Sequence, residues 1–407
     1  MQVNAGGGPD WHRRQQPLDS GESLVNRALC RFASIRAFLA TLACVSSVTA
    51  CARARTSASE LTVRQIWDEY LASKNGHFAA NAGTPSSLWS AAEQAQWRMY
   101  DLAGFYLPDQ AVPEVLRVTP VDPAVDSAYQ IVTQFWPQSP TPRDSSTKPV
   151  LTMTVFARRE GDRWVLANAL PYLTAEWTRE TRGRISYRVA PALTFNADRA
   201  RSAAAFVDSL AAAFRVPAPD RIDYFVTESV DQALEILGVV VPERFGAAGG
   251  FAKPVNAQVF SGIPDLGENY RHELAHVVLL PVLRGAEISL LASEGVPTWL
   301  GGTAGRDFSA SVRQLESVLR AQPQLTLDAI IDSVAVASEI RNTAGGVLAQ
   351  MLNDTGGAQA VREYLRSGAR PAAIRAALER LLKRPWSTIV ADWRRTVGRL
   401  VSNREHR

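Results

Sequence analysis

The chain has 407 residues, of which 46% are hydrophobic and 21% charged, values typical of a globular protein with enough apolar side chains for more than one core. The formal net charge is only +4, from 44 basic and 40 acidic residues. Nucleic-acid binding needs a concentrated basic surface, so this charge argues against nucleic acid as a partner. The three cysteines, Cys30, Cys44 and Cys51, lie in the first 51 residues. The rest of the chain can therefore hold neither a disulfide framework nor a thiolate zinc site.

The first 51 residues have the pattern of a targeting segment. Arginines precede an apolar stretch, 37–50, that ends in small residues, as in a secretory signal. Residues 48–51, Val-Thr-Ala-Cys, resemble a bacterial lipobox, which implies a lipidated Cys51; simple cleavage near Ala50 and an uncleaved anchor are the alternatives. We expect a leader over 1–51, a polar tether over 52–59, and a protein anchored in the bacterial cell envelope facing the periplasm, or secreted.

Residues 60–172 are predicted to form a small α+β accessory domain. Apolar side chains recur at helical spacing over 61–73 and 87–103, which predicts two helices. Four stretches rich in β-branched and aromatic residues follow and are predicted strands: 115–121, 128–136, 150–158 and 163–169. Glu160-Gly161-Asp162 predicts a tight turn between the last two. Two helices followed by a meander of strands resemble the cystatin-like or the nuclear-transport-factor-like fold.

A second domain is predicted over 183–407, and its first part, 183–262, alternates strands and helices as a mixed sheet does. Strands are predicted at 185–189, 222–227 and 255–260, and helices at 196–214 and 230–237. Asn196 is the predicted N-cap of the first of these helices. The remainder is predicted to be nearly all helical, with one pair of helices within 267–300 and a helical lobe over 301–407. The predicted helices are 267–280, 287–300, 308–321, 340–354, 357–366, 371–382 and 387–401.

The segment from His272 to His276 reads His-Glu-Leu-Ala-His. On a helix, residues i and i+4 lie on one face, so both imidazoles can reach one cation at ordinary zinc–nitrogen distances. Glu273 lies near the same edge, where its carboxylate can accept a proton from water. The alternative is two core histidines with Glu273 in solvent, but buried imidazoles without a metal would need several hydrogen-bond partners.

A metal centre open to substrate needs a third protein ligand, and Glu294 is the candidate. It follows His276 by 18 positions, with Pro281 and Gly285 between them. Pro281 is predicted to end the first helix, which allows an antiparallel return of the chain that brings Glu294 over both histidines. The alternative is an exposed helix residue, but the neighbours of Glu294 are apolar, and an unpaired carboxylate among them would be costly.

The H-E-x-x-H motif and the segment Ser293-Glu294-Gly295 together resemble the peptidase MA-like gluzincins, the group of thermolysin and the large zinc aminopeptidases. The resemblance covers residues 183–407 and implies a thermolysin-like mixed sheet with a helical lobe, a bound Zn²⁺, and hydrolysis of peptide bonds. It also implies metal ligation by His272, His276 and Glu294, with Glu273 as general base and later proton donor.

The chain departs from the aminopeptidase branch of this group at two places. That branch has a Gly-x-Met-Glu-Asn stretch whose glutamate holds the substrate amine, whereas the comparable stretch here, 249–256, contains no acid. This favours an endopeptidase. The branch also has a tyrosine that donates to the tetrahedral intermediate. In this chain the position of that tyrosine is occupied by Asn342, whose side-chain amide could donate the hydrogen bond. Arg341, next to it, and Tyr270, upstream, are the alternative donors.

These observations lead to a hypothesis of a monomeric zinc endopeptidase of the envelope, whose partners are peptide or protein substrates. The alternative from another class is a metal-binding but catalytically weak or inactive peptidase-fold protein that serves as a binding or assembly factor. A zinc hydrolase acting on a non-peptide bond is a third possibility. Zinc is the cofactor in all three. The second hypothesis differs from the first in that the chain lacks the family's tyrosine donor to the oxyanion, so that its peptidase activity would be weak or absent.

Overall fold

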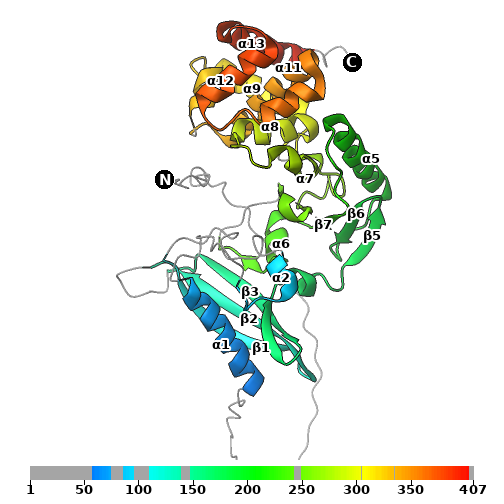
Figure 1. Ribbon diagram of the computed structural model, residues 1–407, viewed down its shortest axis with the longest axis vertical. Coiled ribbons are helices and arrows are strands. Elements are labelled where there is room, and N and C mark those ends of the chain that lie inside the picture. Colours follow the sequence, from blue (N-terminus) through cyan, green and yellow to red (C-terminus); the bar gives the residue numbers. More distant parts are fainter. Residues whose placement is uncertain are drawn as a thin grey trace, which may run out of the picture. The chain divides into compact units, whose positions relative to one another are not determined.

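The computed structural model describes residues 57–74, 86–95, 110–138, 147–242, 249–303, 305–333 and 335–402. These residues form two β-sheets and a helical C-terminal region (Figure 1), so the predicted α+β class is confirmed. The predicted leader, Cys51 and the tether up to residue 56 lie outside the described residues. Among the described residues, no helix is long and apolar enough to cross a lipid bilayer.

The first sheet is an antiparallel meander in the order β1-β2-β3-β4. Its strands are β1 (Val112–Asp122), β2 (Val125–Trp136), β3 (Leu151–Glu160) and β4 (Arg163–Ala167). The predicted turn between β3 and β4 is present, with Gly161 at φ 66°. All four strands lie where the sequence predicts them, because β-branched and aromatic residues are concentrated there.

Helix α1 (Ala58–Ser73) packs on this sheet. It begins three residues before the predicted start, because the Ser57 hydroxyl accepts a hydrogen bond from the Glu60 backbone N–H and caps the first turn. Its buried side chains include Val63, Trp67 and Tyr70, whose spacing defines one helix face. The predicted helix 87–103 is helical only over α2 (Ala91–Ala95) in its described part.

One short strand from later in the chain completes the first sheet. Strand β8 (Val239–Val240) pairs antiparallel with β3, with Val239 opposite Met153. The Thr154 N–H donates to the Gly238 carbonyl at 2.6 Å beside this pairing. The first sheet therefore depends on residues that follow most of the second sheet in sequence.

Glu93, on α2, is a buried carboxyl group at the end of β4. Its Oε1 accepts a hydrogen bond from the Asn168 backbone N–H at 2.9 Å, whereas Oε2 is buried and has no hydrogen-bond partner among the described residues. Burial raises the pKa of Glu93 to about 7, against the opposing effects of the Asn168 hydrogen bond and the Arg158 charge.

The second sheet is mixed and has the order β5-β6-β7-β10-β9. Its strands are β5 (Thr178–Arg182), β6 (Ile185–Val189), β7 (Ile222–Val226), β10 (Gln258–Ser261) and β9 (Gly250–Lys253). β6, β7 and β10 are mutually parallel, and the two outer strands are antiparallel to their neighbours. Alternate side chains of β7 enter different cores, with Tyr224 on one face and Phe225 on the other.

The predicted strand over 255–260 is wrong in its bounds. Residues Pro254–Asn256 form a 3₁₀ turn, because the proline fixes φ and cannot donate to a strand ladder. The strand that follows, β10, is paired on both sides. Among the described residues, β9 is therefore the outermost strand on the β10 side of the sheet, and β5 is the outermost strand on the other side.

The helices around the second sheet are α4 (Leu170–Leu173), α5 (Ala197–Phe214) and α6 (Val230–Glu235). Asn196 caps α5 as predicted, since its side chain accepts from the N–H groups of Asp198 and Arg199. The C-terminal region consists of α7 (Arg271–Leu283), α8 (Leu290–Gly301), α9 (Phe308–Ala321), α10 (Leu327–Asp332), α11 (Ser338–Leu365), α12 (Pro371–Leu382) and α13 (Trp386–Ser402).

Several helix boundaries in this region differ from the prediction: α7 begins at Arg271 rather than at 267, and α8 begins at Leu290 rather than at 287. Pro281 lies inside α7, which continues to Leu283; the proline removes one hydrogen bond but the buried Val282 keeps the last turn packed. The helices predicted at 340–354 and 357–366 correspond to the two segments of α11, which meet at a kink at Gly357, where φ is 62° and ψ −164° and the backbone is not helical.

Candidate metal centre

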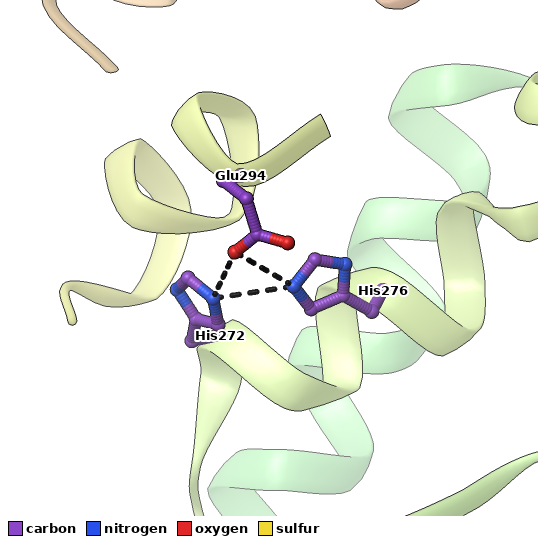
Figure 2. A group of neighbouring side chains, drawn as sticks. All are labelled: His272, His276 and Glu294. Atoms are coloured by element: carbon purple, nitrogen blue, oxygen red, sulfur yellow. Dashed lines mark hydrogen bonds and ion pairs between the residues drawn. The ribbon is translucent and has the colours of Figure 1, made fainter. Parts of the chain in front are cut away.

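Three predicted ligands converge on one point (Figure 2). His272 and His276 project from the same face of α7, and Glu294 reaches them from α8. The two Nε2 atoms are 3.2 Å apart. Glu294 Oε2 lies 3.5 Å from His272 Nε2 and 3.6 Å from His276 Nε2. The side chains thus come together from two helices with their ligand atoms facing one another.

The three distances fit one tetrahedral cation. Zinc–ligand bonds of about 2.0–2.2 Å place the ligand atoms of a tetrahedral site roughly 3.3–3.6 Å apart, and the observed separations run from 3.2 to 3.6 Å. Two imidazole nitrogens and a carboxylate oxygen are a donor set that zinc accepts. Three protein ligands leave a fourth position for water or substrate, which is the arrangement of catalytic rather than structural zinc sites.

Burial is uneven across the three ligands. The His272 and His276 side chains are 6% and 16% exposed, whereas that of Glu294 is 32% exposed. The site is therefore closed behind His272 and reachable from solvent on the side of Glu294. A substrate would have to approach from that side.

The electrostatics of the site keep Glu294 ionised. Burial by itself raises the pKa of the Glu294 carboxyl, but the facing His272 and His276 side chains outweigh it and hold the pKa well below its usual range. Burial likewise lowers the pKa of His276, yet the facing Glu294 carboxylate outweighs it and raises the pKa above its ordinary value. A carboxylate that is charged at neutral pH is ready to bind a divalent cation.

Two tyrosines of the second sheet hold the start of α7. The Tyr224 hydroxyl, from β7, donates to the Gly267 carbonyl at 2.7 Å and accepts from the Tyr270 N–H at 2.9 Å. The Tyr187 hydroxyl, from β6, donates to the Glu268 carbonyl at 3.2 Å. Both rings are fully buried. The segment before His272 is therefore tied to the rigid interior of the sheet, which fixes the direction in which α7 begins.

Helix α8 is held against α11 by direct backbone contact. A Cβ atom on Gly345 of α11 would lie 2.0 Å from the Leu291 carbonyl oxygen and 3.1 Å from the Gly295 Cα of α8. Only glycine permits so close an approach of two helices. The contact flanks Glu294, since Leu291 precedes it by one turn and Gly295 follows it. Packing on α11 therefore sets the depth at which the third ligand stands.

The predicted catalytic residues lie near this centre or on the helices that build it. Glu273 is buried, 6% exposed, in the first turn of α7, and its charge contributes to the raised pKa of His276. The Tyr270 ring lies 6.1 Å from the His272 ring between centroids. Asn342 is on α11, 9% exposed, and its Oδ1 is buried without a hydrogen-bond partner among the described residues. Their catalytic roles stay predictions.

Several residues that support the centre were not foreseen. These are Tyr187, Tyr224, Gly345 and Gly302, whose carbonyl oxygen lies 2.7 Å from His272 Nδ1. The tyrosines occupy alternating strand positions, as ordinary core residues do, so nothing in the sequence marks them. The pair Gly301-Gly302 is a recognisable helix-ending signal, but its contact with a helix 30 residues earlier is visible only in three dimensions.

Comparison with known proteins gives a distant structural likeness. No family model and no curated protein matches the chain. Among solved structures, the chain is similar to a two-domain M1 zinc metallopeptidase, a glutamate-to-alanine variant bound to L-arginine. The identity is 13% and the TM-score 0.33, with 74% of this chain and 66% of that chain covered. The chain thus spans slightly less than two thirds of that protein, and the likeness at this level carries no inference about activity.

Proposed function

We propose that this chain is a zinc-dependent peptidase that cleaves peptide bonds within a chain. The observation that supports it is the convergence of His272 Nε2, His276 Nε2 and Glu294 Oε2 at tetrahedral spacing, with a fourth side open. A zinc ion held there would polarise a carbonyl oxygen and bring the pKa of a coordinated water to about 7. His272, His276 and Glu294 would hold the ion.

Glu273 would transfer a proton from the attacking water to the leaving amide nitrogen. Its carboxylate would accept a proton as the water oxygen bonds to the carbonyl carbon, and would return it to the amide nitrogen as the carbon–nitrogen bond breaks. Burial of Glu273 beside the ligands suits this role, because a proton held there exchanges little with bulk solvent. Asn342 or Tyr270 would donate a hydrogen bond to the developing oxyanion.

The edge strand β9 is the proposed binding site of the substrate peptide. Its register with β10 pairs Lys253 with Gln258 and Gly250 with Ser261, so one edge of β9 is used within the sheet and the other can accept an extended peptide. The Tyr270 ring contacts β9, since a Cβ atom on Gly250 would meet Tyr270 Cε1 at 2.8 Å. Strand β9 and the start of α7 are therefore adjacent.

A second candidate function has its own support. The sequence has a single tyrosine after Glu294, Tyr364, and that residue is fully buried with a hydroxyl that has no partner among the described residues. Tyr364 is therefore not available to a substrate, and the site would depend on a weaker donor. A protein that binds zinc but turns over slowly, and that serves as a binding factor in the envelope, is consistent with this. The lipid anchor at Cys51 belongs to the same proposal, outside the described residues.

The test is metal analysis followed by cleavage of a peptide library. We expect about one zinc ion per chain in the wild type, and loss of zinc in Glu294→Gln. The matched control is Glu287→Gln, an exposed glutamate near the start of α8 that should leave zinc unchanged. Cleavage by the wild type and none by Glu273→Gln would support the peptidase. Stoichiometric zinc with equal inertness of both would favour the binding factor, and no zinc in the wild type would overturn both.

A further inference from the structure

The turn that follows α8 touches the metal centre through its main chain. Gly302 ends the helix, with φ 77° and ψ −164°, and its N–H donates to the Thr298 carbonyl at 2.8 Å. Thr303 and Arg306 then exchange two backbone hydrogen bonds of 2.9 Å, which close the turn. The Gly302 carbonyl oxygen lies 2.7 Å from His272 Nδ1, in a buried contact.

We propose that Gly302 is a positioning residue of the metal centre, whose carbonyl fixes the tautomer and orientation of the His272 ring. This inference rests on the proposed zinc site. A carbonyl oxygen can only accept a hydrogen bond, so the proton of a neutral His272 must stand on Nδ1. The lone pair is then on Nε2, the nitrogen that faces His276 and Glu294. The hydrogen bond thus presents the correct nitrogen to the ion without any rearrangement of the ring.

Only glycine fits at residue 302. A Cβ atom at residue 302 would lie 1.9 Å from the Arg306 carbonyl oxygen and 2.9 Å from the Asp307 Cα. The φ and ψ of Gly302 also fall in a region that other residues adopt only under strain. A side chain there would push the turn away from Arg306 and carry the carbonyl oxygen off His272 Nδ1.

The same helix therefore serves the centre at two points. Near its middle, α8 supplies Glu294, and at its end it supplies the carbonyl that orients His272. The turn after α8 is also linked to α11, because Arg306 forms an ion pair of 2.7 Å with Glu339. Helix α8 and the turn after it therefore fix both the position of Glu294 and the orientation of the His272 ring. A metal centre requires its ligands to be held tightly in this way.

The test compares Gly302→Ala with Gly305→Ala. Gly305 lies three residues later in the same turn and has nearly the same φ, 78°, but a Cβ atom there meets nothing closer than Ile263 at 3.5 Å. Both variants place alanine at a positive φ, but only in the first does the added Cβ atom stand against backbone, 1.9 Å from the Arg306 carbonyl oxygen. With folding checked by circular dichroism, zinc affinity is measured by competition with a chromophoric chelator, and ligand geometry by the visible spectrum of the cobalt(II) protein.

We expect Gly302→Ala to weaken zinc binding by about 10–100-fold, the usual effect of losing a partner behind a ligand, and to alter the cobalt spectrum. Gly305→Ala should retain both properties of the wild type. Wild-type affinity and spectrum in a folded Gly302→Ala protein would overturn the inference. If the wild type cleaves peptides and Gly302→Ala has unchanged zinc affinity, this inference alone is refuted. A wild type that binds no zinc would refute the proposed function.

A second measurement needs no variant to fold. In wild-type protein labelled with ¹⁵N at histidine and kept at a pH where the imidazole is neutral, the His272 ring should show a proton on Nδ1 and none on Nε2. Nitrogen chemical shifts distinguish the two tautomers directly. An Nε2–H tautomer for His272 would refute the assignment even if Gly302→Ala proved insoluble.

Discussion

Replacing Gly345 by alanine should separate α8 from α11 and weaken both the fold and the metal centre. The added Cβ atom would stand 2.0 Å from the Leu291 carbonyl oxygen. An ordinary contact needs about 3.4 Å, so the two backbones must move apart by more than ~1 Å. Because the obstacle is backbone on both sides, no side-chain rotation can relieve it.

The magnitude follows from two opposing effects. Overpacking of a close contact costs about 1–3 kcal/mol, while alanine in place of glycine inside a helix returns up to about 1 kcal/mol. We expect a net loss of about 1–2 kcal/mol and a fall in Tm of roughly 2–4 °C for each kcal/mol lost. Metal ligands tolerate displacements of only about 0.2 Å, so a shift of Glu294 with α8 should also reduce zinc content.

The assay is thermal unfolding followed by circular dichroism, together with zinc analysis of the purified protein. The control is Gly398→Ala in α13, where a Cβ atom meets nothing within 4 Å. There the same substitution should raise Tm, because only the helix-propensity gain remains. A Gly345→Ala protein with unchanged Tm and full zinc would refute the reasoning, since the helices would then have room that the backbone contact denies.

Three further predictions concern single side chains. Glu273→Gln should keep its zinc and lose about 10²–10⁴-fold in peptide hydrolysis, measured as kcat/KM, because the proton acceptor is removed but no ligand is; equal activity would exclude Glu273 as the base. Asn342→Ala should lower kcat by about 10²–10³-fold at unchanged zinc content if its amide stabilises the oxyanion, and the same loss in Tyr270→Phe instead would assign that role to the tyrosine. Glu93→Gln should flatten the pH dependence of stability: the folded pKa of Glu93, about 7, lies above that of the unfolded chain, so the wild type loses stability as pH rises from about 4.5 to 7, by up to about 3 kcal/mol. Urea unfolding at pH 5 and pH 8 would show the slope in the wild type alone, and a slope preserved in the variant would contradict this account.

The parts of the fold that follow from local sequence signals were predictable. The amphipathic stretches over 308–321 and 371–382 coincide with α9 and α12, since each has a strong apolar face and a clear start, Asp307 as N-cap or Pro371 in the first turn. The convergence of His272, His276 and Glu294 was predictable for a related reason. Two histidines one turn apart share a helix face whatever the rest of the chain does.

The remaining features depend on contacts between distant segments. β8 has two residues and β9 four, too few for a periodic pattern, and each exists because a neighbouring strand offers hydrogen bonds. The carbonyl of Gly302 carries no side-chain signal, and its role depends wholly on where α8 ends relative to His272.

The pairing of β8 with β3 has a consequence for synthesis of the chain on the ribosome. One half of the β3 edge is covered by β4, its neighbour along the chain, but the other half is covered only when Val239 and Val240 arrive. These residues emerge after β5, β6, α5, β7 and α6 have been translated. Until then the newly made first sheet exposes unpaired backbone groups beside Met153. Such an edge can pair with strands from other chains. Correct assembly of the first sheet thus waits until three strands of the second sheet, β5, β6 and β7, have been made.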